Sequence, residues 1–324
     1  MSNTTKRLLL AAVFSLSATA AFAQGFPNKP ITMIVPFAAG GPTDIIARIV
    51  SDNMSKTLGQ QIVIENVAGA GGTTGITRAM NASPDGYTIA MGHLGTLSAA
   101  PALFPDLRYK PLDGIQHIGV AGGTPILIVA KKDFPAKDLK EFVAYLKANP
   151  TKANEAHAGV GAVSWTTCTL LKSQLALTDI NSVPYRGTGP ALNDLVGGQV
   201  DFMCDQIPSV IGQVKAGTIK AYAIASAARS PALPDIPTTT EAGLPGYQIE
   251  AWNGIVAPNA VPADIVAKLA DALDKALDDA GTRKRLEDLG AIVPSKVDRS
   301  PAGFKALVQR DFDKLNPALV AAKK

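Results

Sequence analysis

Residues 31–44 read ITMIVPFAAGGPTD, and this stretch decides the fold class. Its first five residues are apolar and predict a buried strand over 31–35. Residues 36–42 form a glycine-containing turn. From about residue 43 to 58 the apolar side chains recur at helical spacing on one face, at Ile45, Ile46, Ile49, Val50, Met54 and Leu58. A strand that passes through a glycine-rich turn into a helix is the repeating unit of an α/β fold.

The same unit recurs along the chain in two blocks. In the first block we expect further strands at 61–67 and 87–92, with a helix at 73–81 between them. The second block predicts strands at 126–130, 156–159, 180–185, 200–205 and 219–226, and helices at 138–148, 164–175, 190–196 and 208–216. The remainder predicts a strand at 249–257 and helices at 262–280, 283–289 and 301–320.

Two such blocks indicate two doubly wound α/β lobes with largely parallel sheets. About 300 residues also exceed what one hydrophobic core usually serves. Ligands of doubly wound sheets bind beyond the carboxyl ends of the strands. If the lobes face each other, the glycine turns of both should therefore line one cleft.

The first 23 residues have the features of a signal peptide. Lys6 and Arg7 are basic, residues 8–16 are mostly apolar, and Ala21-Phe22-Ala23 offers small residues before a cleavage point. We expect cleavage after Ala23 and export of the remaining chain. A membrane anchor is the alternative, but the apolar run is too short to span a bilayer stably.

The charge balance argues against nucleic acid and membrane surfaces as partners. The chain has 31 basic and 27 acidic residues. Removing Lys6 and Arg7 leaves 29 against 27, a charge near +2 without basic runs.

Cysteine and histidine usage limits the metal and redox chemistry. Cys168 and Cys204 could form a disulfide in an oxidising compartment or remain two buried thiols. The histidines are His93, His117 and His157, and none has ligand spacing to another. We therefore expect no metal site.

Two turns of the first block offer an anion site. In residues 36–44, Gly40 and Gly41 permit close backbone approach, and Pro42 suits a first helical turn. Free amides at a helix start attract a carboxylate. Residues 68–75, AGAGGTTG, likewise combine glycines with the start of a helix and could bind an anion. They depart from a dinucleotide fingerprint because Thr74 stands where the third glycine belongs, so we expect no nucleotide cofactor.

The second block supplies matching turns. Residues 159–164, GVGAVS, precede a helix, and residues 184–190, PYRGTGP, add open backbone. Asp205 ends a strand, where its carboxylate could reach the cleft or cap the next helix. Arg186 could pair with a ligand carboxylate, with Asp205 or with Asp194.

Five segments, in this order along the chain, resemble the signatures of one family: PFAAGGPTDIIAR, ENVAGAGGTTG, PDGYT, VPYRGTGPALNDLVGGQVD and LPDIPTTTEAGLPGY. The family is that of the tripartite tricarboxylate transporter receptors, also called Bug receptors. The resemblance implies a periplasmic, two-lobed Venus-flytrap protein of the type II binding-protein class. Lobe 1 would comprise residues 24–125 and 248–324, and lobe 2 residues 126–247.

The family resemblance also implies a function. Such a receptor captures a small carboxylate between its lobes and delivers it to a membrane permease. The ligand could be a di- or tricarboxylate, an acidic amino acid or an aromatic acid. We expect a monomer without a cofactor. Docking on the ectodomain of a two-component sensor is the alternative partnership. An enzyme is not expected, because Ser164 lacks the GxSxG elbow and the acidic residues are isolated.

Carried over by position, the resemblance assigns ligand contacts to both lobes. They are Phe37, Ala38, Gly41, Thr43, Gly71, Gly72, Thr73 and His93 in lobe 1, and Gly161, Ala162, Ser164, Trp165, Tyr185, Thr188 and Asp205 in lobe 2. Trp165 departs from the family, in which many relatives carry histidine; it could stack on a planar acid or pack beneath its helix. A CDQ segment at 204–206, as in part of the family, favours a disulfide between Cys168 and Cys204.

Overall fold

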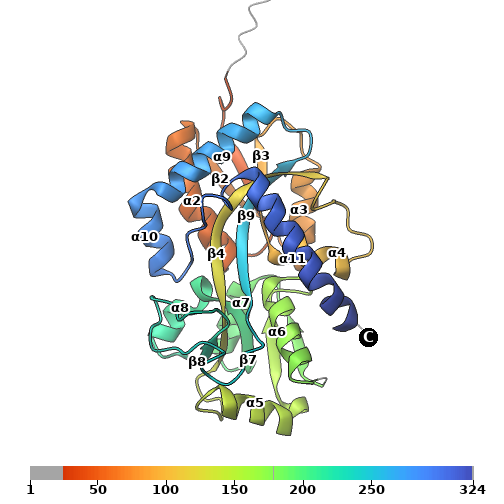
Figure 1. Ribbon diagram of the computed structural model, residues 1–324, viewed down its shortest axis with the longest axis vertical. Coiled ribbons are helices and arrows are strands. Elements are labelled where there is room, and N and C mark those ends of the chain that lie inside the picture. The colour runs from red at the N-terminus through yellow and green to blue at the C-terminus, as the bar shows by residue number, and fades with distance from the viewer. Residues whose placement is uncertain (1–24, 178, 323–324) are drawn as a thin grey trace, which may run out of the picture.

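The structure is a computed structural model that describes residues 25–177 and 179–322 (Figure 1). The signal peptide predicted for residues 1–23 and its cleavage point lie outside these residues. The chain forms a two-lobed α/β fold, with the lobes joined by long strands. In the part of the chain described, no helix is long and apolar enough to cross a membrane.

The strands form a mixed sheet in the order β2-β1-β3-β9-β4-β7-β5-β6, and β8 pairs with β4. Their bounds are β1 Ile31–Val35, β2 Ile62–Asn66, β3 Thr88–His93, β4 Ile115–Lys131, β5 Asn154–His157, β6 Asn181–Pro184, β7 Phe202–Gln206, β8 Ile219–Ile224 and β9 Glu250–Pro258. The pairs β1–β2, β1–β3, β5–β6 and β5–β7 are parallel. The pairs that involve β4 or β9 are antiparallel.

Strand β4 runs through both lobes (Figure 1). From Ile115 to Pro125 it pairs with β9, and from Ile126 to Lys131 it pairs with β7 and β8. The names lobe 1 (25–125 and 248–322) and lobe 2 (126–247) are used below for the ranges proposed from the sequence.

Helices cover both faces of the sheet. They are α2 Pro42–Leu58, α3 Thr73–Met80, α4 Ala100–Leu103, α5 Leu139–Ala148, α6 Val163–Gln174, α7 Thr188–Val196, α8 Ile207–Lys215, α9 Ala263–Asp278, α10 Ala280–Asp288 and α11 Pro301–Ala322. Side chains of β4 alternate between the faces, as a strand buried on both sides requires. Ile126 and Ile128 join one hydrophobic cluster, and Leu127 and Val129 join another.

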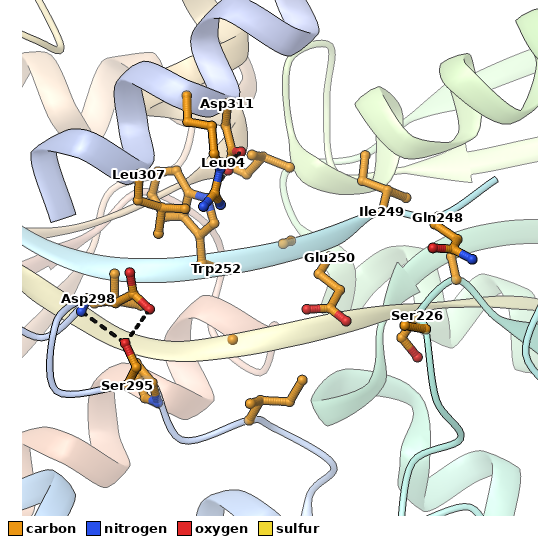
Figure 2. Close-up of a pocket in the computed structure, with 18 of the residues that line it drawn as sticks. Leu94, Ser226, Gln248, Ile249, Glu250, Trp252, Ser295, Asp298, Leu307 and Asp311 are labelled. Carbon is orange, nitrogen blue, oxygen red and sulfur yellow. Dashed lines mark hydrogen bonds and ion pairs between the residues drawn. The ribbon is translucent and has the colours of Figure 1, made fainter. Parts of the chain in front are cut away.

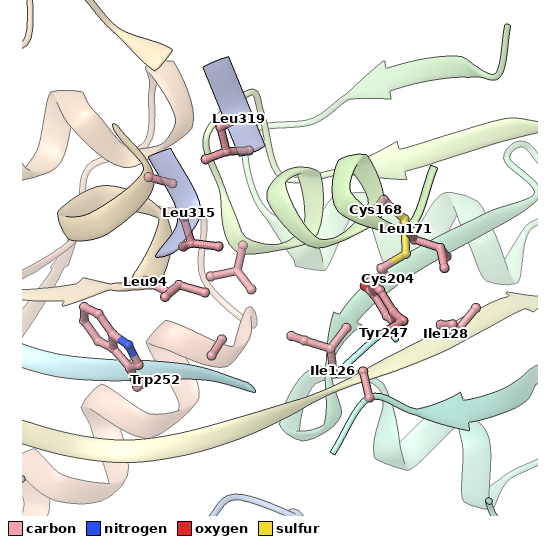
Figure 3. Close-up of a cluster of buried hydrophobic side chains, with 14 of the residues drawn as sticks. Leu94, Ile126, Ile128, Cys168, Leu171, Cys204, Tyr247, Trp252, Leu315 and Leu319 are labelled. Atoms are coloured by element: carbon pink, nitrogen blue, oxygen red, sulfur yellow. A yellow bond between two sulfur atoms is a disulfide. The ribbon is translucent and has the colours of Figure 1, made fainter. Parts of the chain in front are cut away.

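The first of these clusters extends from one lobe into the other (Figure 3). Leu94 and Trp252 contribute from lobe 1, and Leu171 of α6 contributes from lobe 2. The late residues of α11, Leu315 and Leu319, are buried in the same cluster, so α11 packs against both lobes. The other face of lobe 1 has its own cluster, in which α2 and α9 pack on β1 and β3.

Packing of helix α2 on the sheet fixes the position of its amino end. Pro42 lies in its first turn, and Gly59 ends it in the left-handed region at φ 66°. The apolar face, with Ile46, Val50 and Met54 fully buried, fastens the helix to the sheet. Each such side chain contributes about 1.5–3 kcal/mol of burial free energy. The amino end of α2 is therefore held at the carboxyl end of β1.

Two expectations about the sheet were wrong. The strand expected at 126–130 is only the end of β4, and the sheet is mixed, with as many antiparallel as parallel pairs of strands. The glycines of the earlier part of β4 weaken the local strand signal. Close packing requires one of them, because a Cβ on Gly119 would lie 2.2 Å from the carbonyl oxygen of Arg299. The short helical segment after β3, from Gly95 through α4, was also not predicted.

A disulfide joins Cys168 of α6 to Cys204 of β7. Both residues are fully buried, and 36 positions separate them in the sequence. The bond therefore links the helix that begins at the interlobe cleft to the strand that carries Asp205 (Figure 3).

We predict that loss of this disulfide lowers the free energy of unfolding by about 3–4 kcal/mol, because it closes a long loop in the unfolded chain. Urea unfolding with and without a reductant measures the difference. The double variant Cys168→Ala, Cys204→Ala should be insensitive to reductant. A parent whose thiols are shown to be reduced, yet whose unfolding midpoint is unchanged, would contradict the prediction.

Candidate ligand-binding site

A narrow, partly open cavity lies between the lobes. Lobe 1 contributes Phe37, Gly41, Pro42, Thr43 and His93 to its wall. Lobe 2 contributes Ala158, Ala162, Val163, Ser164, Thr188, Asp205 and Gln206. No lysine or arginine is among these residues. The wall thus combines apolar residues with polar side chains, none of which is a lysine or an arginine.

Four helices begin at this cavity. The lining includes the first turns of α2 and α6, the first residue of α7, Thr188, and the residue that precedes α8, Gln206. Each of these helices follows a strand, so the sheet directs all four amino ends to one place. Amino ends of helices carry unpaired N–H groups and partial positive charge. The cavity therefore favours an anion.

His93 adds a neutral hydrogen-bond donor at the end of β3. Its Nδ1 accepts hydrogen bonds from the backbone N–H groups of Gly95 (2.8 Å) and Thr96 (3.1 Å). Burial lowers the pKa of His93 to about 3, so the ring is neutral. The proton is therefore on Nε2, which has no partner among the residues described. Phe37 stacks on the ring at 4.9 Å and holds its orientation.

Asp205, at the end of β7, is fully buried. Its Oδ1 accepts a hydrogen bond from the backbone N–H of Gln206 at 2.8 Å. For Oδ2 the described chain supplies no hydrogen-bond partner. Burial raises the pKa of Asp205 to about 6, although Thr188, Gln206 and Ser209 act in the opposite direction.

Gln206 connects the cavity to the strands that cross between the lobes. Its Oε1 accepts hydrogen bonds from Thr124 of β4 (2.6 Å) and Asn253 of β9 (3.2 Å). All three side chains are buried. The helix start of α8 is thus fastened to β4 and β9.

The lobes are in direct contact around the cavity. The backbone N–H of Ala38 donates to the carbonyl oxygen of Arg186 at 3.2 Å. A Cβ on Gly71 would lie 1.8 Å from the carbonyl oxygen of Val160 in the other lobe. This is the closed arrangement, and it requires glycine at position 71.

The structure brings eight of the predicted contacts to the cavity: Phe37, Gly41, Thr43, His93, Ala162, Ser164, Thr188 and Asp205. Ala38, Gly71 and Gly161 instead lie in the contacts between the lobes. Tyr185 lines a second groove, here called the outer groove, which Gly71, Val160 and Arg186 also line. Its hydroxyl donates to Asp194 at 2.6 Å. Gly72 lies against Phe37, while Thr73 lines a separate surface hollow.

Trp165, Arg186 and Asp44 lie outside the cavity wall. Trp165 packs against the hydrophobic cluster and does not line the cavity, which is the packing alternative weighed for it. Arg186 is exposed at the outer groove. Asp44 is turned away from the cavity wall, with its carboxylate bound to Arg48 (2.9 Å), Asn66 and the Gly40 N–H.

Sequence reasoning missed Pro42, Ala158, Val163 and Gln206 as parts of the wall. Gln206 had a local signal, because it directly follows Asp205 and precedes the proline-containing start of α8. Its hydrogen bonds to Thr124 and Asn253 had no signal in the sequence, because they join segments that are distant along the chain.

A larger groove of about 550 Å³ lies where β4 and β9 cross between the lobes (Figure 2). Two pairs of its polar side chains bond to each other: Trp252 Nε1 donates to Asp311 at 2.7 Å, and Ser295 donates to Asp298 at 2.7 Å. The groove offers no counterpart to the converging helix starts of the interlobe cavity.

Comparison with known proteins identifies the family of this chain. The sequence model described as tripartite tricarboxylate transporter family receptor matches residues 46–315. The chain belongs to this receptor family. The UPF0065 protein in the TAR-I ttuE-ttuC' intergenic region of Agrobacterium vitis is 42% identical over 89% of this chain and 84% of its own length.

Solved structures of similar receptors share the whole fold. MatC from Rhodopseudomonas palustris, with bound malate, is 48% identical, with a TM-score of 0.88 over 91% of this chain and 100% of that one. The periplasmic binding protein BugD is 40% identical, with a TM-score of 0.89 over 92% of this chain and 99% of that one. The two-lobed periplasmic-binding-protein fold expected from the sequence is confirmed.

We predict that Asp205→Asn stabilises the ligand-free receptor at pH 7.5 by about 2–3 kcal/mol, from a pKa difference of about two units. The folded pKa, about 6, exceeds the unfolded value of 3.8. Between these values the folded form retains a proton that the unfolded chain releases, so stability falls as pH rises through this window. The advantage of the variant should therefore vanish near pH 4.

Denaturant unfolding at pH 4 and pH 7.5 checks this prediction. Asp201→Asn is the control, because the Asp201 carboxylate is paired with Lys131 at 2.7 Å and its removal should give no gain. A variant at position 205 that is less stable than the parent at pH 7.5 would contradict the account of the buried carboxyl.

Proposed function

We propose that this receptor works in the periplasm, closes its lobes around a small dicarboxylate and delivers it to the membrane permease of a tripartite tricarboxylate transporter. The observation that carries the proposal is the interlobe cavity at which four helices begin. An anion there is stabilised by backbone dipoles and by the Nε2–H of His93.

A relative supports a small dicarboxylate as the ligand. Malate, bound in the 48% identical structure, is a four-carbon diacid.

The absence of lysine and arginine from the wall fits a receptor that must release its ligand. Helix ends typically contribute about 0.3–1 kcal/mol each at exposed sites, and more where buried. Their effect depends on both lobes being present around the anion, since α2 belongs to lobe 1 and α6, α7 and α8 to lobe 2. Opening therefore separates the anion from several of these groups together.

We expect millimolar malate or succinate to raise the melting temperature by several degrees, because a ligand at 100 times its Kd stabilises the folded form by about 2.7 kcal/mol. A thermal-shift screen with citrate, benzoate and glucose alongside measures the ligand class. Stabilisation by glucose, together with indifference to every acid, would refute the proposal.

Gly71→Ala should weaken dicarboxylate binding at least tenfold, because the added Cβ meets the Val160 carbonyl oxygen only when the lobes close. Gly59→Ala is a matched control: its φ of 66° is close to the 61° of Gly71, and no atom lies within 4 Å of the added Cβ. Isothermal titration calorimetry measures both. Equal affinities for the two variants would show that this contact does not control closure.

A further inference from the structure

The cavity wall contains two buried polar atoms of opposite kind without partners in the described chain, His93 Nε2 and Asp205 Oδ2. The first donates a hydrogen bond and the second accepts one. A ligand made only of ionised carboxylates can satisfy the donor but not the acceptor. The presence of one unpaired donor and one unpaired acceptor therefore constrains which functional groups the ligand has.

We propose that Asp205 makes the receptor selective for acids that carry a hydrogen-bond donor, a hydroxyl or an amino group, beside a carboxylate. The inference rests on the proposed function, because it concerns the same cavity. It goes further in naming the residue that distinguishes substituted from unsubstituted diacids.

The position of the Asp205 carboxylate is fixed by its surroundings. The backbone N–H of Gln206 occupies Oδ1, so only Oδ2 is available to a ligand. Across the strand pair, the neighbour of Asp205 is Leu127 of β4, which is apolar. Thr188 of α7 and Ser209 of α8 place hydroxyls near the carboxylate and lower its pKa, yet neither reaches Oδ2 with hydrogen-bond geometry. The Ser209 hydroxyl donates instead to the Gln206 carbonyl oxygen at 2.8 Å.

No positive side chain compensates this carboxylate within the cavity wall as described. His93, the titratable group that faces it from lobe 1, is neutral. An unsubstituted diacid would place its own negative charge near Asp205 and leave Oδ2 unpaired, and an unpaired buried charged group is costly. A hydroxyl or ammonium group on the ligand removes that cost by donating to Oδ2.

Sites built to bond a ligand hydroxyl can reject the analogue without it by large factors, because their own buried group is then unpaired. We therefore expect the parent to bind L-malate or L-aspartate at least tenfold more tightly than succinate. These three acids have the same four-carbon diacid skeleton and differ in the substituent, which is hydroxyl, ammonium or hydrogen.

Asp205→Asn converts the acceptor into a donor at one atom. The asparagine Oδ1 can still accept from the Gln206 N–H, which places the Nδ2 amide group where Oδ2 was. We expect the ratio of succinate Kd to malate or aspartate Kd to fall at least tenfold in this variant, with succinate binding as well as in the parent or better.

Isothermal titration calorimetry of the three acids on the parent, Asp205→Asn and Asp201→Asn tests the inference. Asp201 lies just before β7, is paired with Lys131 and is absent from the cavity wall, so its variant should keep the parental ratio. The parental preference also shows whether the donor is a hydroxyl or an ammonium group.

The two proposals fail differently. A parent that binds all three acids with equal affinity, or an Asp205→Asn variant that keeps the parental ratio, overturns the role of Asp205 while the receptor function stands. A parent that binds none of the acids overturns the receptor function itself. The ratio of succinate Kd to malate or aspartate Kd in the parent is measured without any variant. The inference can therefore be refuted even if the Asp205→Asn variant fails to fold.

Discussion

The antiparallel pairing of β4 with its neighbours is the constraint on which the rest of the molecule depends. One continuous strand pairs with β9 in lobe 1 and with β7 and β8 in lobe 2, so neither lobe has an independent sheet. The carboxyl ends of β1 and β3 consequently face those of β5, β6 and β7 (Figure 1). A shared anion site between the helix starts follows from that arrangement.

The site combines attraction by dipoles with one buried negative charge, and the two act at different atoms. Helix starts and His93 provide donors, while Asp205 remains an acceptor whose burial opposes its ionisation. Such a carboxyl destabilises the folded chain unless a ligand pairs with it. The local instability is therefore concentrated at the proposed ligand site, as is common for functional sites.

Local features of the sequence predicted much of this structure. The strand expected at 31–35 is β1, and the helix starts were expected from glycine and proline positions, because these signals lie within a few residues. The early part of β4 and the mixed sheet were not predictable in this way. They depend on close approach to segments such as Arg299, far away in the sequence. Likewise, position alone could not separate Thr188, in the cavity wall, from Trp165, which packs on the core.

The hydrogen bond from the Ala38 N–H to the Arg186 carbonyl oxygen and the approach of Gly71 to the Val160 carbonyl oxygen join main-chain atoms of the two lobes. Neither contact uses a side chain of the cavity wall, such as Ser164 or Asp205. Substitutions in the wall therefore leave these contacts intact. In the proposed receptor, a change of ligand preference does not require a change in how the lobes meet.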